Sequence, residues 1–141
     1  MADAAFIHRW FEEVWNKRRE DAVDEMLAED GVGHGLAGPD GNQIRGPESF
    51  KKLQRAFLSA YPDLKITVED TVVEGDKIAA RCRITGLHAG EGIGVAPTNK
   101  PVEFTGMLIV RVKDGKIVEA WNEFNFMEMY TQVGALTLNL Q

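Results

Sequence analysis

The alternation of apolar and polar residues predicts a long β-hairpin near the end of the chain. Residues 104–124, FTGMLIVRVKDGKIVEAWNEF, carry apolar side chains at alternating positions on both sides of Asp114-Gly115. This dipeptide favours a type I′ turn, in which both central residues need a positive φ. With Lys113 opposite Lys116, the register predicts four pairs on one face: Val110/Glu119, Leu108/Trp121, Gly106/Glu123 and Phe104/Asn125.

That face would combine polar groups with large apolar side chains. Glu119, Glu123 and Asn125 would lie beside Trp121 on an otherwise apolar surface. Buried polar groups are costly unless they are paired, so the pattern predicts the floor of a ligand pocket. Gly106, opposite Glu123, would leave room for the ligand there.

Three helices are predicted before the sheet. Apolar residues at three- and four-residue steps over 6–15 indicate an amphipathic helix with Asp3 as its N-cap. The same spacing continues over residues 19–29, and a third helix runs from Gly46-Pro47 to Pro62. Residues 31–46 are expected to form a loop, with a brief strand around 32–36.

Another hairpin is predicted between the third helix and the final hairpin. Residues 64–88 alternate with period two around a turn near Gly75-Asp76, which places Asp70 opposite Arg81 as a surface ion pair. The fold class is therefore α+β, one domain with three N-terminal helices packed on a curved, mainly antiparallel sheet. The helices can cover only one face of the sheet. The other face is expected to be the interface of a homodimer, through the apolar residues Ile109, Val118, Ala120 and Phe124.

Composition narrows the choice of partner and compartment. The 141 residues have a net charge of −6 and no Lys/Arg cluster, which argues against a nucleic acid or an anionic membrane surface as partner. The single cysteine, Cys82, cannot form an internal disulfide and suits a reducing compartment. Without an apolar N-terminal block or a run of transmembrane length, a soluble, cytoplasmic protein is expected.

Several local motifs give the chain a family resemblance. They are Gly46-Pro47-Glu48, Tyr61-Pro62-Asp63, the loop from Gly86-Leu87-His88 to Ala96-Pro97-Thr98, and the strand Gly115–Trp121 that leads to Gln132-Val133-Gly134. In this combination the chain resembles the SnoaL-like polyketide cyclase family of the nuclear transport factor 2-like superfamily. The resemblance implies a cone-shaped fold, a pocket between helices and sheet, no cofactor, frequent dimers, and acid/base chemistry such as aldol-type cyclisation or isomerisation of a small carbonyl compound.

One position departs from the family pattern. The catalytic aspartate of the family usually lies four residues after the strand tryptophan, where this chain has Asn125. An amide cannot exchange a proton usefully near neutral pH. A non-catalytic small-ligand-binding module therefore remains an alternative, and so does a relative of the epoxide hydrolases in the same superfamily, which would need a carboxylate and an arginine aimed at one water.

Four residues are candidates for catalysis. His88 ends a strand and His34 lies among glycines, and either could act as a general acid or base, or be a histidine bonded within a loop. Glu123 could be a base if burial raises its pKa, or the partner of an arginine. Asn125 could orient a ligand oxygen or cap the helix that follows it.

A second group could form the wall of the site. Aromatic and apolar side chains of this kind suit a small apolar or aromatic carbonyl ligand, although they could equally be core. The predicted substrate-binding residues are Phe11, Trp15, Phe57, Tyr61, Met107, Glu119 and Trp121. No His-x-x-x-His spacing occurs, so no metal site is predicted.

Overall fold

A computed structural model describes residues 2–137 of the protein. Its helices are α1 (Ala4–Trp10), which continues directly into the π-helix η1 (Phe11–Asn16), α2 (Glu20–Met26), α3 (Gly46–Ala60) and α4 (Phe126–Gln132). Its strands are β1 (Leu27–Ala37), β2 (Gln43–Arg45), β3 (Lys65–Glu74), β4 (Lys77–Leu87), β5 (Pro101–Lys113) and β6 (Lys116–Phe124).

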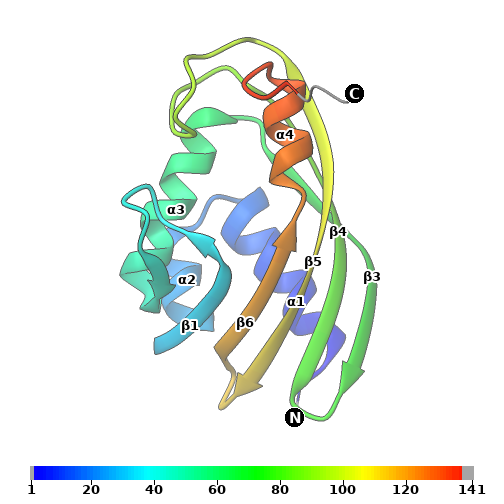
Figure 1. The fold of residues 1–141 in the computed structure, drawn as a ribbon. Helices are drawn as coiled ribbons and strands as arrows, with labels where there is room; N and C mark the ends of the chain where they lie inside the picture. Colours follow the sequence, from blue (N-terminus) through cyan, green and yellow to red (C-terminus); the bar gives the residue numbers. More distant parts are fainter. Residues whose placement is uncertain (1, 138–141) are drawn as a thin grey trace.

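The six strands form one curved sheet in the order β2-β1-β6-β5-β4-β3. Every neighbouring pair is antiparallel except β1 and β6, which run parallel. The sheet curves around α1, α2 and α3, while α4 follows β6 at the upper end (Figure 1). The predicted α+β class, with helices on one face of a curved and mainly antiparallel sheet, is confirmed. Among the described residues, no helix is long and apolar enough to cross a membrane.

The N-terminal helices begin where the sequence predicts. The side chain of Asp3 accepts a hydrogen bond from the backbone N–H of Phe6 at 3.2 Å, which confirms the predicted N-cap. The second helix was expected to reach Glu29 but ends at Met26, because Leu27 pairs with Ile117 of β6 and begins β1. The loop expected to follow is mostly strand β1, so the sheet gains a parallel pair that local spacing did not indicate.

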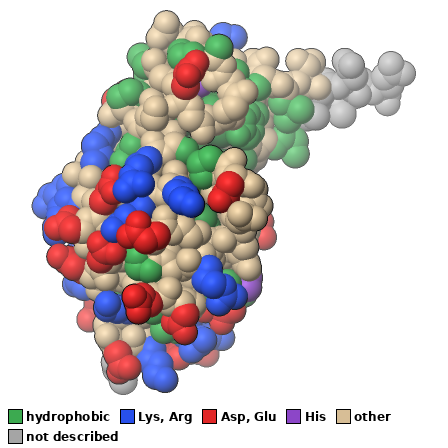
Figure 2. All heavy atoms as spheres, turned by 90° about the vertical axis from the view of Figure 1, so that its left-hand side faces the viewer, with side chains coloured by type: hydrophobic (Ala, Val, Ile, Leu, Met, Phe, Trp, Pro, Cys, Tyr) green, Lys and Arg blue, Asp and Glu red, His purple; other side chains and the backbone are tan. Residues whose placement is uncertain are grey.

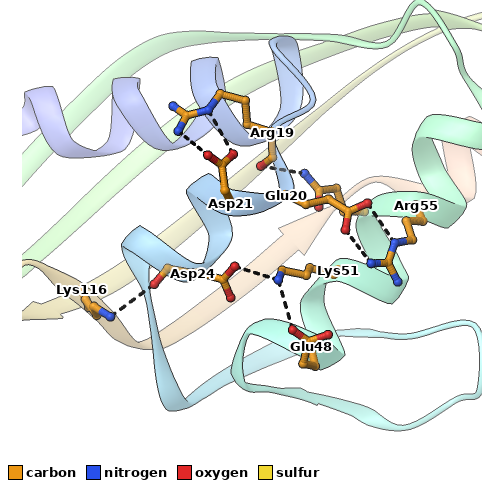
Figure 3. Close-up of polar contacts among 9 residues, drawn as sticks. Arg19, Glu20, Asp21, Asp24, Glu48, Lys51, Arg55 and Lys116 are labelled. Carbon is orange, nitrogen blue, oxygen red and sulfur yellow. Dashed lines mark hydrogen bonds and ion pairs between the residues drawn. The ribbon is translucent and has the colours of Figure 1, made fainter.

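Ion pairs join α2 to α3 on the outside of the helical layer (Figure 3). The ammonium group of Lys51 lies 2.8 Å from Asp24 and 3.1 Å from Glu48, and its side chain is only 11% exposed. These hydrogen bonds, first to Asp24 and then to Glu48, raise the pKa of Lys51. Arg55 and Glu20 form a bidentate pair beside it. The network holds α2 and α3 together over the sheet.

The turn of the final hairpin matches the sequence prediction. Asp114 and Gly115 have φ values of 53° and 77°, and Lys113 pairs with Lys116. The register beyond it was predicted wrongly. A bulge follows the pair Val112/Ile117, so that Arg111 pairs with Glu119 and every later pair shifts by one residue. Such a shift exchanges the two faces of a strand.

The shift reverses the predicted assignment of faces on β6. The inner face, toward the helices, carries Ala120, Asn122 and Phe124 opposite Val110, Leu108 and Gly106. The outer face carries Glu119, Trp121 and Glu123 opposite Arg111, Ile109 and Met107. Gly106 was expected to make room for a ligand, but it makes room for the ring of Phe124, which a Cβ atom there would overlap at 1.8 Å.

Candidate functional site

A cavity lies between the helices and the inner face of the sheet. It has a volume of about 80 Å³, and its wall combines residues of α1, η1, α3 and α4 with residues of all six strands. The wall includes three residues predicted to bind substrate, Phe11, Trp15 and Phe57. Among the described lining residues none is ionisable. The site is therefore built to hold an apolar molecule.

Asn122 supplies the amide group of this wall. The sequence analysis missed it because the simple hairpin register turned it outward. Its side-chain N–H₂ donates to the backbone carbonyl of His34 at 2.9 Å, and the residue is 7% exposed. A carbonyl can only accept, which fixes the orientation of the amide. The described residues offer no hydrogen bond to Oδ1 of Asn122, so this oxygen can accept one from a ligand.

Aromatic rings surround the part of the cavity nearest the surface. The ring of Phe126 lies 5.7 Å from that of Phe57, 6.1 Å from Phe104 and 6.2 Å from Phe124, measured between centroids. Phe57, Phe124 and Phe126 are partly exposed and also line the cavity. Drug-sized ligand pockets have volumes of roughly 300–1,000 Å³. The cavity is therefore smaller than this range.

Two polar side chains that do not line the cavity lie buried where α3 and β4 end. His88 and Tyr61 are both 0% exposed, and their rings are 5.6 Å apart. Nδ1 of His88 is 2.9 Å from Oγ1 of Thr98 and accepts from its backbone N–H, whereas Nε2 has no partner. The Tyr61 hydroxyl also lacks a partner, and burial raises its pKa to about 12. His88, predicted to end a strand, is thus an interior residue.

The remaining predicted site residues lie on the outer face of the sheet. Nε2 of His34 is 2.7 Å from Glu119, and Gln43 donates to the other ring nitrogen at 3.2 Å. The hydrogen bond from His34, followed by that from Arg111, lowers the pKa of Glu119. His34 also stacks on Trp121 at 5.7 Å. These side chains form a cluster of their own, separated from the cavity by the sheet.

Glu123, Asn125 and Met107 share that outer position. They line a shallow groove with Arg81, and all are exposed. Asn125 accepts from the backbone N–H of Glu128 and so caps α4, which was its alternative role in the sequence analysis. Glu119 and Trp121 were predicted to contact substrate through the wrong register, and the structure places them, and Met107 as well, away from the cavity.

Charge does not single out another site. Arg81 and Arg83 both pair with Glu69 on the outer face, at 3.0 and 3.1 Å, so they do not present an arginine and a carboxylate to a water in the cavity. On the face shown in Figure 2, basic and acidic side chains are intermixed over the helices. Within residues 2–137, no cluster of three or more His, Cys, Asp or Glu side chains could hold a metal ion.

Comparison with known proteins identifies relatives of this architecture. A model of the SnoaL-like polyketide cyclase family matches residues 5–133. No curated protein matches significantly. Among solved structures, IdmH from Streptomyces antibioticus, a candidate polyketide cyclase, is 33% identical over 93% of this chain and 97% of its own, with a TM-score of 0.79.

Two further structures extend the comparison. AclR from Streptomyces galilaeus, a candidate hydroxylase, is 27% identical over 97% of this chain and 87% of its own, with a TM-score of 0.79. A Catenulispora acidiphila protein with a ketosteroid isomerase-like fold is 14% identical over 96% of both chains, with a TM-score of 0.76. The second likeness concerns the fold alone.

Proposed function

Because the chain belongs to the SnoaL-like polyketide cyclase family, we propose that it binds a small apolar carbonyl compound in the cone cavity and promotes its ring closure or isomerisation without a cofactor. The observation that carries this proposal is the apolar cavity whose wall includes Asn122, a residue whose amide oxygen takes no hydrogen bond from the described residues. Apolar walls bind the carbon skeleton, and Asn122 accepts a hydrogen bond from an enol or hydroxyl group.

The chemistry that suits this wall is catalysis by confinement. An intramolecular aldol closure forms one bond between the enol carbon and the carbonyl carbon, and the enol proton ends on the former carbonyl oxygen, so no atoms enter or leave. Holding the two carbons in contact supplies much of the rate, since well-oriented intramolecular reactions reach effective molarities of roughly 10⁵–10⁸ M. The proton passes between the two ligand oxygens directly or through water, because the described lining has no acid or base.

Binding without turnover is the second candidate function. It is favoured by the same lack of an ionisable lining group and by Asn125 at the position of the family's aspartate. Linear β-dicarbonyl esters discriminate between the two. Cyclised product detected by liquid chromatography and mass spectrometry, at a rate above the uncatalysed one, supports the cyclase. Saturable binding with no ring formation supports the binding module.

Replacing Asn122 with leucine is expected to remove the preference for hydrogen-bond donors. Wild-type protein should bind phenol about tenfold more tightly than toluene, its isostere without a hydroxyl group, because one buried hydrogen bond contributes up to about 1.5 kcal/mol. Asn122→Leu should bind both equally. Isothermal titration calorimetry measures the four affinities, with Asn42→Leu in the exposed turn as a matched control. An unchanged ratio in Asn122→Leu would exclude Asn122 as the anchor.

We also propose that the outer sheet face forms a homodimer. Cross-strand pairing aligns one row of side chains across five strands: Val72, Ala79, Ile109, Trp121 and His34. Ile109 and Trp121 are 43% and 37% exposed. The row beside it contains Asp70, Arg81 and Glu123, whose opposite charges could pair across a two-fold axis. Val118, Ala120 and Phe124, expected here from the sequence, do not belong to this row.

The dimer is tested by placing a charge in the centre of that row. Trp121→Glu is expected to give a monomer in size-exclusion chromatography with light scattering, because it buries a carboxylate against apolar side chains and close to Glu119. Met127, 56% exposed on α4, provides the control Met127→Glu, which should stay dimeric. Wild-type protein that is monomeric at every concentration would disprove the proposal.

A further inference from the structure

Tyr61 and His88 form a buried pair, and each has a hydrogen-bond donor for which the described residues provide no acceptor. The backbone N–H of Thr98 can only donate, so Nδ1 of His88 is the unprotonated nitrogen and Nε2 carries the proton. This N–H and the Tyr61 hydroxyl are both buried and unpartnered. An unsatisfied buried donor costs roughly 1–3 kcal/mol. The two rings have centroids 5.6 Å apart, so an acceptor placed between the donors would satisfy both.

The pair lies beyond Phe57 and Ile84 at the ends of two elements, α3 and β4, that line the cavity. Tyr61 follows Phe57 by one helical turn, with its backbone N–H bonded to the Phe57 carbonyl at 2.8 Å. His88 lies four residues beyond Ile84 of β4. Phe57 and Ile84 both line the cavity. Between Ile84 and His88, Gly86 has no side chain, and Tyr61 packs there, with its Cβ 3.1 Å and its ring Cδ1 3.2 Å from where a Cβ of Gly86 would stand.

We propose that the Tyr61 hydroxyl and the Nε2–H of His88 together bind one ligand oxygen, the carbonyl that becomes negatively charged during ring closure. This inference rests on the proposed cavity function and specifies its substrate class. A ligand reaches the pair when the partly exposed Phe57 ring turns aside. Two fixed donors stabilise developing negative charge on oxygen far better than water does in a dry site.

The polar groups then favour a ligand that has a hydrogen-bond donor at one end and a hydrogen-bond acceptor at the other. Asn122 offers an acceptor, which suits an enol or hydroxyl group. Tyr61 and His88 offer donors, which suit a carbonyl oxygen. An enolised dicarbonyl compound of small size has both groups on one apolar skeleton, and it is the substrate class that the site would take.

Tyr61→Phe tests the pair because it removes the hydroxyl and keeps the ring. The probes are cyclohexanone and methylenecyclohexane, which share a shape but differ in the acceptor oxygen. Wild-type protein is expected to bind the ketone about tenfold more tightly than Tyr61→Phe does, and both should bind the alkene equally. Infrared spectra should show the carbonyl stretch of the bound ketone at lower wavenumber in wild type than in the variant. Urea unfolding should show Tyr61→Phe to be as stable as wild type or more so.

Tyr130→Phe is the matched control. Its hydroxyl donates to the Ile93 carbonyl at 3.2 Å, so its loss should lower stability and leave ketone binding and the carbonyl stretch unchanged. If wild type and Tyr61→Phe bind the ketone equally and show the same carbonyl stretch, the pair binds only water and this inference is wrong. Binding of the alkene would still support the proposed function of the cavity. If neither probe binds wild type, both the cavity function and the inference fail.

Discussion

Ala120→Leu should abolish ligand binding while leaving the protein folded. Ala120 is on the inner face of β6 and lines the cavity beside Asn122. A leucine there fills apolar space that a ligand would occupy. Losing the burial of one small apolar ligand, about 3 kcal/mol, corresponds to roughly a hundredfold loss of affinity for phenol and toluene. Calorimetric titration measures the loss, and any cyclisation of β-dicarbonyl esters should disappear with it.

The stability of the same variant separates blocking from unfolding. Filling an apolar void commonly adds about 0.5–2 kcal/mol to the free energy of unfolding. The same substitution at Ala5, exposed on α1, serves as the control and should leave binding unchanged. If Ala120→Leu were folded and bound both probes like wild type, the ligand site would have to lie elsewhere in the protein.

Gly35→Ala is expected to have the largest effect on stability. Gly35 of β1 has a φ of +80°, and a Cβ atom there would lie 2.0 Å from the backbone oxygen of Asn122. The positive φ costs an alanine about 1–2 kcal/mol, and the backbone of β6 must also move to remove the overlap. We expect a loss of about 3 kcal/mol or more in the free energy of unfolding, measured by urea denaturation.

A second glycine isolates the contribution of the overlap. Gly41 has a φ of +81° but no atom within 4 Å of its Cβ position. Gly41→Ala should therefore cost only about 1–2 kcal/mol, because it carries the cost of the positive φ alone. The overlap at Gly35 also adjoins the Asn122 anchor, so surviving Gly35→Ala protein should lose its preference for phenol. Equal stability of the two variants would contradict the close packing of β1 on β6.

Local pattern was sufficient for most elements of the fold. Helical spacing located α1 and α3, proline and the Asp3 cap located their starts, and Asp114-Gly115 located the turn between β5 and β6. These features depend on residues close in sequence. The register that sets Asp70 opposite Arg81 was found in the same way and is confirmed, but Arg81 forms its ion pair with Glu69 and not with Asp70. The aromatic wall residues Phe11, Trp15 and Phe57 followed from the helical spacing, because a helix has one apolar side to bury.

The candidate site depended on a feature that local pattern did not fix. Both faces of β6 contain apolar residues, so alternation alone permits either to be buried. One set contains Glu119 and Glu123, and the other contains Asn122 as its polar member. The relative cost of burying two carboxylates against one amide was the signal that favoured the second set. Burying the second set also requires a bulge in the hairpin, and the regular register assumed from the turn contains no bulge.

The sequence by itself therefore determined the class of fold, the turn, the caps and the aromatic wall, because neighbouring residues decide backbone conformation and amphipathic spacing. The tertiary structure alone decided which side of β6 faces the helices, that Leu27–Ala37 becomes a strand parallel to β6, and that Tyr61 meets His88. Each of these depends on contacts between distant residues. A one-residue bulge moved Glu119 and Glu123 to the outer face of the sheet and placed Asn122 in the wall of the cavity.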